Sequence, residues 1–467
     1  MRAREDVDAF PRPRWHLTPP SGWMNDPNGP IRLNGRYHLY YQHNPDAPIW
    51  GNLHWGHASS ADLLHWRHEP IALRPDEKGL MFTGSVVHDT DGTAGFGEGA
   101  LVAVFTQHLE GLERQSLAWS LDGGQTWTPY QDNPVLEAPP GCRDFRDPKV
   151  IAHGAGWLMV LAVGSELWWY RSQDLRGWEF ATKMTPPVPS PQSIIEVPDL
   201  VRVPVEGTGT DVWTLIYSVE PPRGTASHPR HVHWLPGTLC DTGFAATPTR
   251  GGDVVDAGPV YYASLTWDLS SAGEPIAIGW MDERVAPDGD APRPWCGRQS
   301  IPRRLSLVQR EDSLVLRQRP VLPDWTPSAR VAINAGSTES VALAHATFAA
   351  RVTAGGAGDR IRAARLRLDS EPANTNSTSV SLGPTALEVR SSDVGVRRER
   401  VDADAGDLML ISDYGSLEVF ADAGLGVASI LTPVAGSTGR MEVENDGPDP
   451  VVVEIMFATD DAGDWQP

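Results

Sequence analysis

The sequence predicts an all-β protein that consists of a five-bladed β-propeller followed by a C-terminal β-sandwich. Three observations favour this fold class: frequent turn residues, evenly spaced apolar stretches, and a change in the character of the chain after Pro320. The 467 residues include 45 Gly and 41 Pro, which interrupt the sequence at short intervals. Such punctuation is typical of many short strands joined by turns, and few windows show the period of an amphipathic helix.

Five apolar stretches recur along the first two thirds of the chain, and each is typical of a buried strand. They begin at Tyr37, Leu101, Trp157, Val212 and Ile276, and successive starts lie 55 to 64 residues apart. A Ser-x-Asp turn followed by a tryptophan accompanies three of them, at residues 60–66, 120–127 and 172–178. A period slightly above the ~50 residues of kelch repeats is expected for four-stranded blades with long loops, so five periods predict five blades. The alternative is a β-sandwich whose strands happen to recur evenly.

The chain changes character after Pro320, where the segment VLPDWTP is typical of a linker. Beyond it, stretches with alternating apolar and polar residues begin at Ala364, Thr378, Leu408, Leu417 and Val451. Alternation with period two at this spacing favours a β-sandwich, and tryptophan nearly disappears, which argues against further blades. We therefore predict a propeller domain at residues 1–320 and a sandwich domain at residues 327–467.

The composition restricts the partners of the protein. The formal net charge is −21, from 39 basic and 60 acidic residues, and such a field repels nucleic acids and anionic lipids but not a neutral substrate. Residues 1–17 contain no signal-peptide core, and no run of 18 apolar residues occurs, so we expect a cytoplasmic protein without a membrane partner. A secreted protein whose leader had been removed is the alternative. The three cysteines and the histidines at positions 54, 57, 65, 68 and 88 lack metal-ligand spacing, so we expect no metal.

Three acidic residues precede equivalent apolar stretches. Asp26 lies 11 residues before the first stretch, Asp147 lies 10 before the third, and Glu196 lies 16 before the fourth. A proline follows each within two residues and favours extended backbone, so we expect all three carboxylates on inner strands that face the propeller axis. Each motif alone is explained as well by a turn or an ion pair. Together they predict glycoside hydrolysis, which requires one protonated and one ionised carboxyl group.

Aromatic residues near the same strand ends fit a sugar substrate, because sugar rings stack on aromatic faces. They are Trp23, Trp50, Trp55, Phe82, Trp280 and Trp295. For any one of them, packing between blades is the alternative interpretation.

Several motifs resemble those of glycoside hydrolase family 32, which includes invertases, levanases, inulinases and some fructosyltransferases. The string HLTPPSGWMNDPNG at residues 16–29 is similar to the family's opening signature. Further similar segments are YQHNP at 41–45, WGNLHWGH at 50–57, FTGS at 82–85, FRDP at 145–148, WM at 280–281, WCGRQSIPR at 295–303 and LEVF at 417–420. The resemblance covers nearly the whole chain.

This resemblance implies roles for individual residues. Asp26 would be the nucleophile, Glu196 the general acid/base, and Asp147 the stabiliser of an oxocarbenium-like transition state, with Arg146 beside it. The remaining residues that would line the fructose pocket are Asn25, Gln42, Trp50, Phe82 and Ser85. The mechanism would retain configuration, with the two working carboxyl groups about 5–5.5 Å apart, and would need no metal or organic cofactor.

Three positions depart from the family pattern. Val197 replaces a cysteine, Thr83 replaces a serine, and Val260 stands where an aspartate is common. We expect Val197 to affect the pH optimum and Val260 the leaving-group preference, because the first adjoins Glu196 and the second lies near the expected pocket.

Three alternatives remain beside a hydrolase that releases fructose from sucrose or fructans. A fructosyltransferase would share every catalytic residue, because only the acceptor differs. A non-catalytic sugar-binding propeller would be expected to lack at least one of the three acids. An inverting enzyme that acts on arabinan or xylan would need more widely separated carboxylates. The sequence does not choose among sucrose, levan, inulin and short oligosaccharides, and it predicts no oligomeric state.

Overall fold

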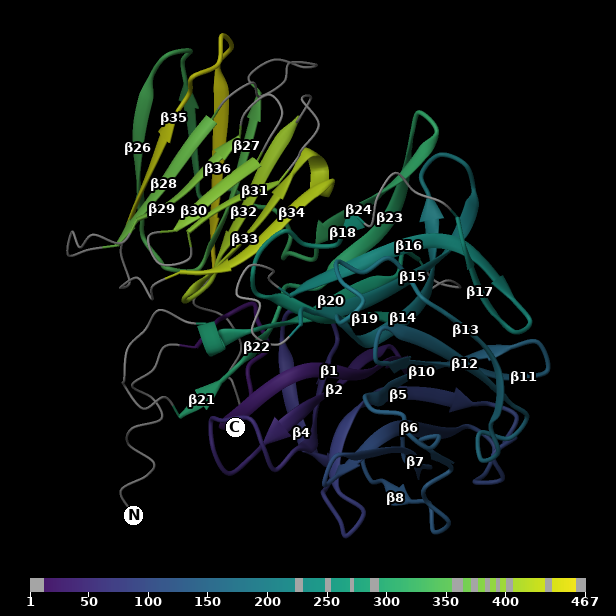
Figure 1. Ribbon diagram of the computed structural model, residues 1–467. Helices are drawn as coiled ribbons and strands as arrows, with labels where there is room; N and C mark the ends of the chain where they lie inside the picture. Colours follow the sequence, from purple (N-terminus) through teal and green to yellow (C-terminus); the bar gives the residue numbers. More distant parts are fainter. Residues whose placement is uncertain are drawn as a thin grey trace, which may run out of the picture.

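The structure is a computed structural model in which two β-sheet assemblies lie side by side (Figure 1). It describes residues 12–222, 230–247, 253–268, 273–285, 294–354, 364–370, 377–382, 387–391, 395–399, 406–432 and 439–458. Apart from two short 3₁₀ segments, Glu283–Val285 and Asp422–Gly424, the regular elements in these ranges are strands. In this part of the chain no helix has the length and apolar character needed to cross a bilayer.

Five blades form the propeller, and each is a mainly antiparallel sheet of four principal strands. Blade I contains β1 (Gly22–Leu33), β2 (Arg36–Asn44), β3 (His54–Ser60) and β4 (Trp66–Leu73). Blade II contains β5 (Leu80–Asp89), β6 (Ala100–Leu109), β7 (Leu112–Ser120) and β8 (Thr128–Pro129), with β9 (Leu136–Glu137) beside β7. Blade III contains β10 (Phe145–His153), β11 (Gly156–Val163), β12 (Glu166–Ser172) and β13 (Glu179–Met184).

The last two blades are linked by one parallel pair between β14 and β23. Blade IV contains β14 (Ile194–Val205), β15 (Thr210–Glu220), β16 (His231–Cys240) and β17 (Gly243–Ala246), with β18 (Asp253–Val254) beside β16. Blade V contains β19 (Tyr261–Trp267), β20 (Ile276–Met281), β23 (Arg303–Arg310) and β24 (Ser313–Pro320), with β22 (Arg298–Gln299) beside β20. The short strand β21 (Trp295–Cys296) pairs in parallel with β1 and so joins the late part of the propeller to the first blade.

The five-bladed prediction is confirmed. The five apolar stretches form the second strands β2, β6, β11, β15 and β20. The first strands contact one another in a closed ring in the order β1, β5, β10, β14, β19 and back to β1. These inner strands surround the propeller axis, so a residue at the same level of each strand faces a common centre.

The Ser-x-Asp repeat forms the turn between the third and fourth strands of blades I to III. In blade I the Ser60 hydroxyl accepts a hydrogen bond from the Leu63 N–H (2.8 Å), and the Trp66 indole donates to the Leu63 carbonyl (3.0 Å). The indoles of Trp127 and Trp178 make the same bond to the residue three positions earlier. The repeat is therefore a local turn motif, in which side chains make hydrogen bonds to backbone groups of the turn and a tryptophan is held over the turn.

Two six-stranded sheets form the sandwich (Figure 1). The first has the order β25 (Ala329–Ile333), β36 (Val451–Phe457), β27 (Phe348–Ala354), β32 (Asp407–Ser412), β33 (Ser416–Ala421) and β34 (Gly426–Leu431). The second has the order β26 (Thr338–Leu343), β35 (Gly439–Glu444), β28 (Ala364–Ser370), β29 (Ser377–Leu382), β30 (Leu387–Ser391) and β31 (Gly395–Glu399). Alternate residues of the two inner faces, such as Val352, Leu410 and Val443, form its apolar core. We propose the domain division 1–320 and 327–467, because β24 ends at Pro320 and β25 begins at Ala329.

A buried ionic cluster joins the two assemblies. The His16 imidazole lies between the carboxylates of Asp413 (2.8 Å) and Glu418 (2.9 Å). Arg303 reaches Glu418 at 2.6 Å and Asp256 at 2.9 Å, and all five of these residues are buried. Buried charges are tolerated only when they are paired, so this cluster fixes the relative position of propeller and sandwich.

Val260 belongs to the same boundary. It is buried and packs with Met281 of the propeller and Leu431 of the sandwich. The Val260 side chain therefore packs in this apolar group. Its expected effect on the leaving-group preference stays a prediction.

Candidate active site

Each inner strand of the propeller carries a break in its pairing register at the same level. The breaks lie between Met24 and Pro27 in β1, Met81 and Gly84 in β5, Arg146 and Lys149 in β10, Glu196 and Asp199 in β14, and Tyr262 and Leu265 in β19. Bulges of this kind re-aim side chains and are common beside active sites. Asp26, Asp147 and Glu196 all lie at these breaks, so the structure brings the three predicted acids to one mouth of the propeller.

Three of these breaks contain a non-glycine residue in the left-handed region. Asp147 has φ 62°, Val197 has φ 48° and Ala263 has φ 52°. Each of their N–H groups donates to a side chain of the preceding blade: Asp147 to Thr106 (3.0 Å), Val197 to Asp147 (2.9 Å) and Ala263 to Ser218 (3.1 Å). Such conformations cost about 1–3 kcal/mol each and persist where the surroundings hold them. This repeated hydrogen bond therefore holds the backbone of one inner strand against the preceding blade at the mouth of the propeller.

The Asp26 carboxylate accepts three hydrogen bonds. Thr83 Oγ1 donates to Oδ2 at 2.7 Å, Gln42 Nε2 donates to Oδ2 at 3.3 Å, and Asn25 Nδ2 donates to Oδ1 at 3.1 Å. Burial raises the pKa of Asp26, whereas the bonds from Thr83 and Asn25 and the charge of Arg230 oppose that rise. The donors favour the ionised form of a carboxyl group that burial would otherwise keep protonated.

Asn25 and Gln42 are themselves held in place. Asn25 Oδ1 accepts a bond from the Trp23 indole (2.7 Å), and its Nδ2 donates to Gln42 Oε1 (3.0 Å). Gln299 of β22 donates to the Asn25 backbone carbonyl (2.7 Å). The amides around Asp26 thus have fixed orientations, as expected of groups that position a reactive carboxylate.

Glu196 lies on β14, two positions from β1 in the inner ring, and one of its side-chain oxygens accepts a hydrogen bond from a phenol. The Tyr262 hydroxyl donates to Oε2 at 2.7 Å, and Arg146 Nε lies 3.6 Å from Oε1. Burial raises the pKa of Glu196; Arg146 and Tyr262 oppose the rise, and the charge of Asp26 adds to it. A raised pKa favours the protonated form, which is the form that a general acid needs.

Arg146 is clamped by two further carboxylates. Its Nη1 contacts both oxygens of Glu113 (2.9 and 3.1 Å), and its guanidinium also binds Asp144 Oδ1 (2.6 Å from Nη2). Burial alone would lower the pKa of Arg146, but Glu196 and Glu113 raise it. The guanidinium is therefore a permanent positive charge in fixed geometry beside Glu196.

The charges of both other acids affect Asp147. Burial raises its pKa well above the usual value; Arg146 opposes this, and Glu196 and Asp26 add to it. That Asp147 responds to both other acids shows that the three carboxyl groups form one electrostatic cluster. Because like charges at close range disfavour one another's ionisation, each carboxylate of the cluster favours the protonated form of its neighbours.

The predicted aromatic residues Trp50 and Phe82 contact each other at the rim. Their ring centroids are 6.2 Å apart in an edge-to-face arrangement, and Phe82 stacks on His108 at 4.6 Å. Trp50 is 51% exposed, so its ring is open to solvent. Ser85 is placed differently: its buried hydroxyl accepts a bond from the Val150 N–H (3.0 Å) and so ties blade II to blade III. Its role as a pocket residue stays a prediction.

Sequence reasoning did not assign Thr83 and Tyr262 to the site. Both lie at the bulges of β5 and β19, so the phase of the propeller repeat was the signal that could have indicated them. It also missed Arg230, whose guanidinium lies 5.3 Å from the Tyr262 ring and 3.1 Å from Asp282 Oδ2. Burial raises the pKa of Asp282 to about 7, although Arg230 opposes the rise. The polar side chains at the mouth therefore include Thr83, Tyr262, Arg230 and Asp282 in addition to the three predicted acids.

A buried ion pair lies where the catalytic bulges end. Lys149 Nζ is 2.5 Å from Asp199 Oδ1, and these residues resume regular pairing after Asp147 and Glu196, respectively. The pair links β10 to β14 directly. Within the described ranges, no group of three or more His, Cys, Asp or Glu side chains is arranged to hold a metal.

Comparisons with known proteins match this arrangement. A sequence profile described as "Glycosyl hydrolases family 32 N-terminal domain" matches residues 16–320. Levanase from Bacillus subtilis (strain 168) is 40% identical over 319 residues, which are 66% of this chain and 47% of that protein. The extracellular exo-inulinase inuE from Aspergillus niger is 33% identical over 348 residues, which are 66% of this chain and 64% of that protein. The chain therefore spans about half to two thirds of the length of these curated relatives.

Solved structures share the complete fold. Exo-inulinase from Aspergillus awamori aligns with a TM-score of 0.85 at 25% identity and covers 96% of this chain and 98% of that chain. Fructofuranosidase from Schwanniomyces occidentalis, complexed with fructose, aligns with a TM-score of 0.83 at 23% identity over the same shares. Both alignments include the propeller and the sandwich.

Proposed function

Because the chain belongs to glycosyl hydrolase family 32, we propose that it is a retaining glycosidase of the β-fructofuranosidase type. Its substrates would be sucrose, fructooligosaccharides or fructans, from which it releases terminal non-reducing β-D-fructofuranosyl units. The observation that carries the proposal is the contrast between two acids at one mouth: Asp26 accepts three side-chain hydrogen bonds, which favour its ionised form, whereas Glu196 accepts one, from Tyr262, and the charge of Asp26 favours its protonated form. One carboxylate and one carboxylic acid are the two groups that this chemistry requires.

In the first step, Asp26 would attack the anomeric carbon of the fructosyl unit while Glu196 donates its proton to the leaving oxygen. Among the side chains of the described residues, Thr83 and Gln42 donate to Asp26 Oδ2 and Asn25 donates to Oδ1, so Oδ1 is the oxygen we assign to the attack. In the second step, Glu196 as carboxylate would take a proton from water, and the hydroxide would release fructose from Asp26. The configuration is retained because two inversions occur.

The other residues at the mouth would bind and stabilise. Asp147 would accept hydrogen bonds from fructose hydroxyls, and Arg146 would help Glu196 to return to its carboxylate form after proton transfer. Trp50 and Phe82 would present an apolar wall to the sugar ring. The relatives named levanase and exo-inulinase favour hydrolysis over transfer to a sugar acceptor.

The test is the release of fructose from sucrose, 1-kestose, levan and inulin by the purified protein. Asp26→Ala removes the assigned nucleophile, and Asp211→Asn, an exposed aspartate on β15, is the matched control. We expect fructose from at least one substrate, no release by Asp26→Ala and unchanged release by Asp211→Asn. Proton NMR of the first product would show the β-anomer. Fructose release that survives in Asp26→Ala would contradict the assignment, and sugar-to-sugar transfer products in place of fructose would favour the transferase.

The predicted cytoplasmic location remains a proposal. The exo-inulinase inuE is described as extracellular. Fractionation of the producing cells, with activity measured in cytosol and culture medium, would decide between the two compartments.

A further inference from the structure

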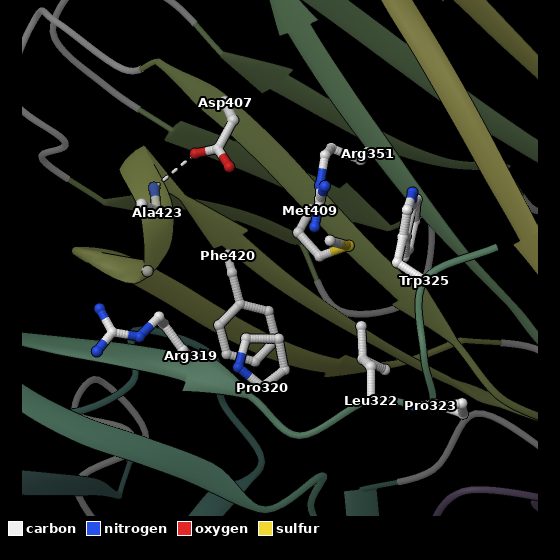
Figure 2. Close-up of a pocket in the computed structure, with 11 residues that line it drawn as sticks. Arg319, Pro320, Leu322, Pro323, Trp325, Arg351, Asp407, Met409, Phe420 and Ala423 are labelled. Carbon is white, nitrogen blue, oxygen red and sulfur yellow. Dashed lines mark hydrogen bonds between the residues drawn. The ribbon is translucent and has the colours of Figure 1, made fainter. Parts of the chain in front are cut away.

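A cavity of about 290 Å³ lies outside the catalytic mouth, where the end of β24 and the segment after it meet the outer face of the sandwich (Figure 2). The propeller side contributes Pro320, Leu322 and Trp325, and the sandwich contributes residues of β27, β32 and β33. Its size is at the lower end of the range of ~300–1,000 Å³ typical of small-molecule sites, so it suits one or two small rings.

The floor of this cavity is apolar. Phe420 and Met409 are almost fully buried and belong to the cluster that also contacts Leu322 and Trp325. In Figure 2 the Phe420 ring lies behind Pro320, and Met409 lies between Phe420 and Arg351. Such a surface accepts the C–H face of a ring but gives no reason to bind a charged group.

The rim of the cavity is polar and incompletely paired. Asp407 Oδ1 accepts a bond from the Ala423 N–H (2.6 Å), and within the described residues its Oδ2 accepts none. The Arg351 guanidinium lies 4.6 Å from the Trp325 ring centroid, and its buried Nε has no hydrogen-bond partner among the described residues. Arg319, at the other edge, is already bound to Glu206 (2.8 Å) and Glu274. A carboxylate acceptor and a guanidinium donor therefore flank the apolar floor.

This combination selects a neutral polyhydroxylated ring. Asp407 would repel an anion, and Arg351 and Arg319 would repel a cation. A sugar can instead donate a hydroxyl hydrogen bond to Asp407 and accept one from Arg351. Its C–H face would cover Phe420 and Met409. We propose that this cavity is a second, non-catalytic carbohydrate site, which holds a fructosyl unit of an oligomeric or polymeric fructan. The identity of the sugar rests on the proposed function, but the presence of a carbohydrate site does not.

A second site on the same chain would act only on long substrates. A polymer held at the cavity raises the effective concentration of its ends at the catalytic mouth, whereas sucrose cannot reach both sites. A single ring bound by a small, partly exposed site is expected to bind weakly, with a Kd of about 1 mM or above. The gain should therefore appear as a lower KM for polymer and not as a higher kcat.

Two variants remove the polar rim with little change of volume: Arg351→Met and Asp407→Asn. Arg330→Met, on the exposed edge strand β25 of the same sheet, is the matched control. Thermal unfolding of each variant would confirm that it is folded. We expect the rim variants to raise KM for levan or inulin about three- to tenfold, to leave kcat and the sucrose KM unchanged, and to differ from Arg330→Met. A polymer KM equal to that of the control in both folded rim variants would overturn the proposal.

A binding measurement separates this inference from the proposed function. Titration of Asp26→Ala with fructooligosaccharides, followed by calorimetry and by saturation-transfer NMR, should show a weak site that disappears when Arg351→Met is added. If the wild type hydrolyses no fructoside, the proposed function fails, yet loss of oligosaccharide binding in the rim variants would still support a carbohydrate site. Binding of glucans but not fructans would overturn the fructan assignment, and identical binding with and without Arg351→Met would overturn the site itself.

Discussion

The catalytic mouth and the propeller–sandwich boundary both bury carboxylates, but they perturb them in opposite directions. At the mouth, burial raises the pKa values of Asp26 and Glu196. At the boundary, Arg303 and His16 outweigh burial and lower the pKa of Glu418 to about 2, and His16 also lowers that of Asp413. Burial raises the pKa in both regions, and it does so even for Glu196, whose side chain is 25% exposed while that of Glu418 is fully buried, so the difference lies in the counter-ions.

This contrast distinguishes a reactive carboxyl group from a structural one. Arg303 bonds directly to Glu418 at 2.6 Å, whereas Arg146 stays 3.6 Å from Glu196 and gives its bonds to Glu113 and Asp144. At the mouth, the Arg146 guanidinium thus lies near Glu196 without forming a close ion pair with its carboxyl group. An incompletely paired acid lowers stability but can exchange a proton, as catalysis requires.

The largest expected effect comes from removing the proton donor. Glu196→Gln should lower kcat about 10²–10⁴-fold, the usual contribution of a general acid. The free energy of unfolding near pH 7 should stay constant or rise, because a carboxyl group whose folded-state pKa is raised destabilises the fold at pH above its unfolded value. Fructose-release kinetics and urea unfolding would measure both quantities.

The matched change at the boundary is Glu418→Gln, which makes the same carboxyl-to-amide replacement in a fully buried glutamate. We expect the opposite pattern: a loss of about 3–5 kcal/mol in the free energy of unfolding and a pH–rate profile like that of the wild type. Similar stability losses for Glu196→Gln and Glu418→Gln would refute the contrast between the two regions.

Arg303→Met should be nearly as damaging to stability. It leaves Asp256 and Glu418 buried without their guanidinium, which is expected to lower the free energy of unfolding by about 3–5 kcal/mol. Arg67→Met is the control, because the Arg67 side chain is 67% exposed beside Glu69, and an exposed pair contributes at most about 1 kcal/mol. Equal losses in urea unfolding would show that the boundary cluster does not stabilise the assembly.

A smaller effect is expected at Thr83. Thr83→Val removes the 2.7 Å bond that favours ionised Asp26, so the pKa of Asp26 should rise further and the acid limb of kcat/KM should move to higher pH. At a fixed pH on that limb, kcat/KM should fall about tenfold, since a hydrogen bond to a charged group contributes about 1.5–3 kcal/mol. Thr83→Ser retains the hydroxyl and should keep the wild-type limb; a shift in both variants would indicate a packing effect.

The smallest effect concerns His16. Burial alone would lower its pKa, but Asp413 and Glu418 raise it above the usual histidine value of 6.5. A raised folded-state pKa means that its contribution to stability is fully present below about pH 6.5 and is lost as pH rises through the folded value. Melting temperatures measured across this range should fall more steeply with pH in the wild type than in His16→Gln. Parallel slopes would show that His16 does not titrate with unfolding.

Much of the fold could be predicted because its signals are local or periodic. The apolar stretches, the Ser-x-Asp turns and the prolines after the three acids each depend on a few adjacent residues. Thr83 and Tyr262 could not be assigned in the same way, because they lie 57 and 66 residues from the carboxyl groups they contact. Ser85 was predicted as a pocket residue from a local motif. Its hydroxyl, however, accepts a hydrogen bond from the Val150 N–H, which lies 65 residues away.

Three features follow from the amino-acid sequence alone: the blade repeat, the level at which Asp26, Asp147 and Glu196 lie on the inner strands, and the change from propeller to sandwich. These follow from periodicity and backbone restriction, which act over short distances along the chain. The pairing of the buried acids, in contrast, depends on how the chain folds in three dimensions. His16 meets Asp413 across 397 residues and Arg303 meets Glu418 across 115. Whether a carboxyl group is reactive depends on such distant counter-ions, because its pKa follows from the charges around it and not from its neighbours in sequence.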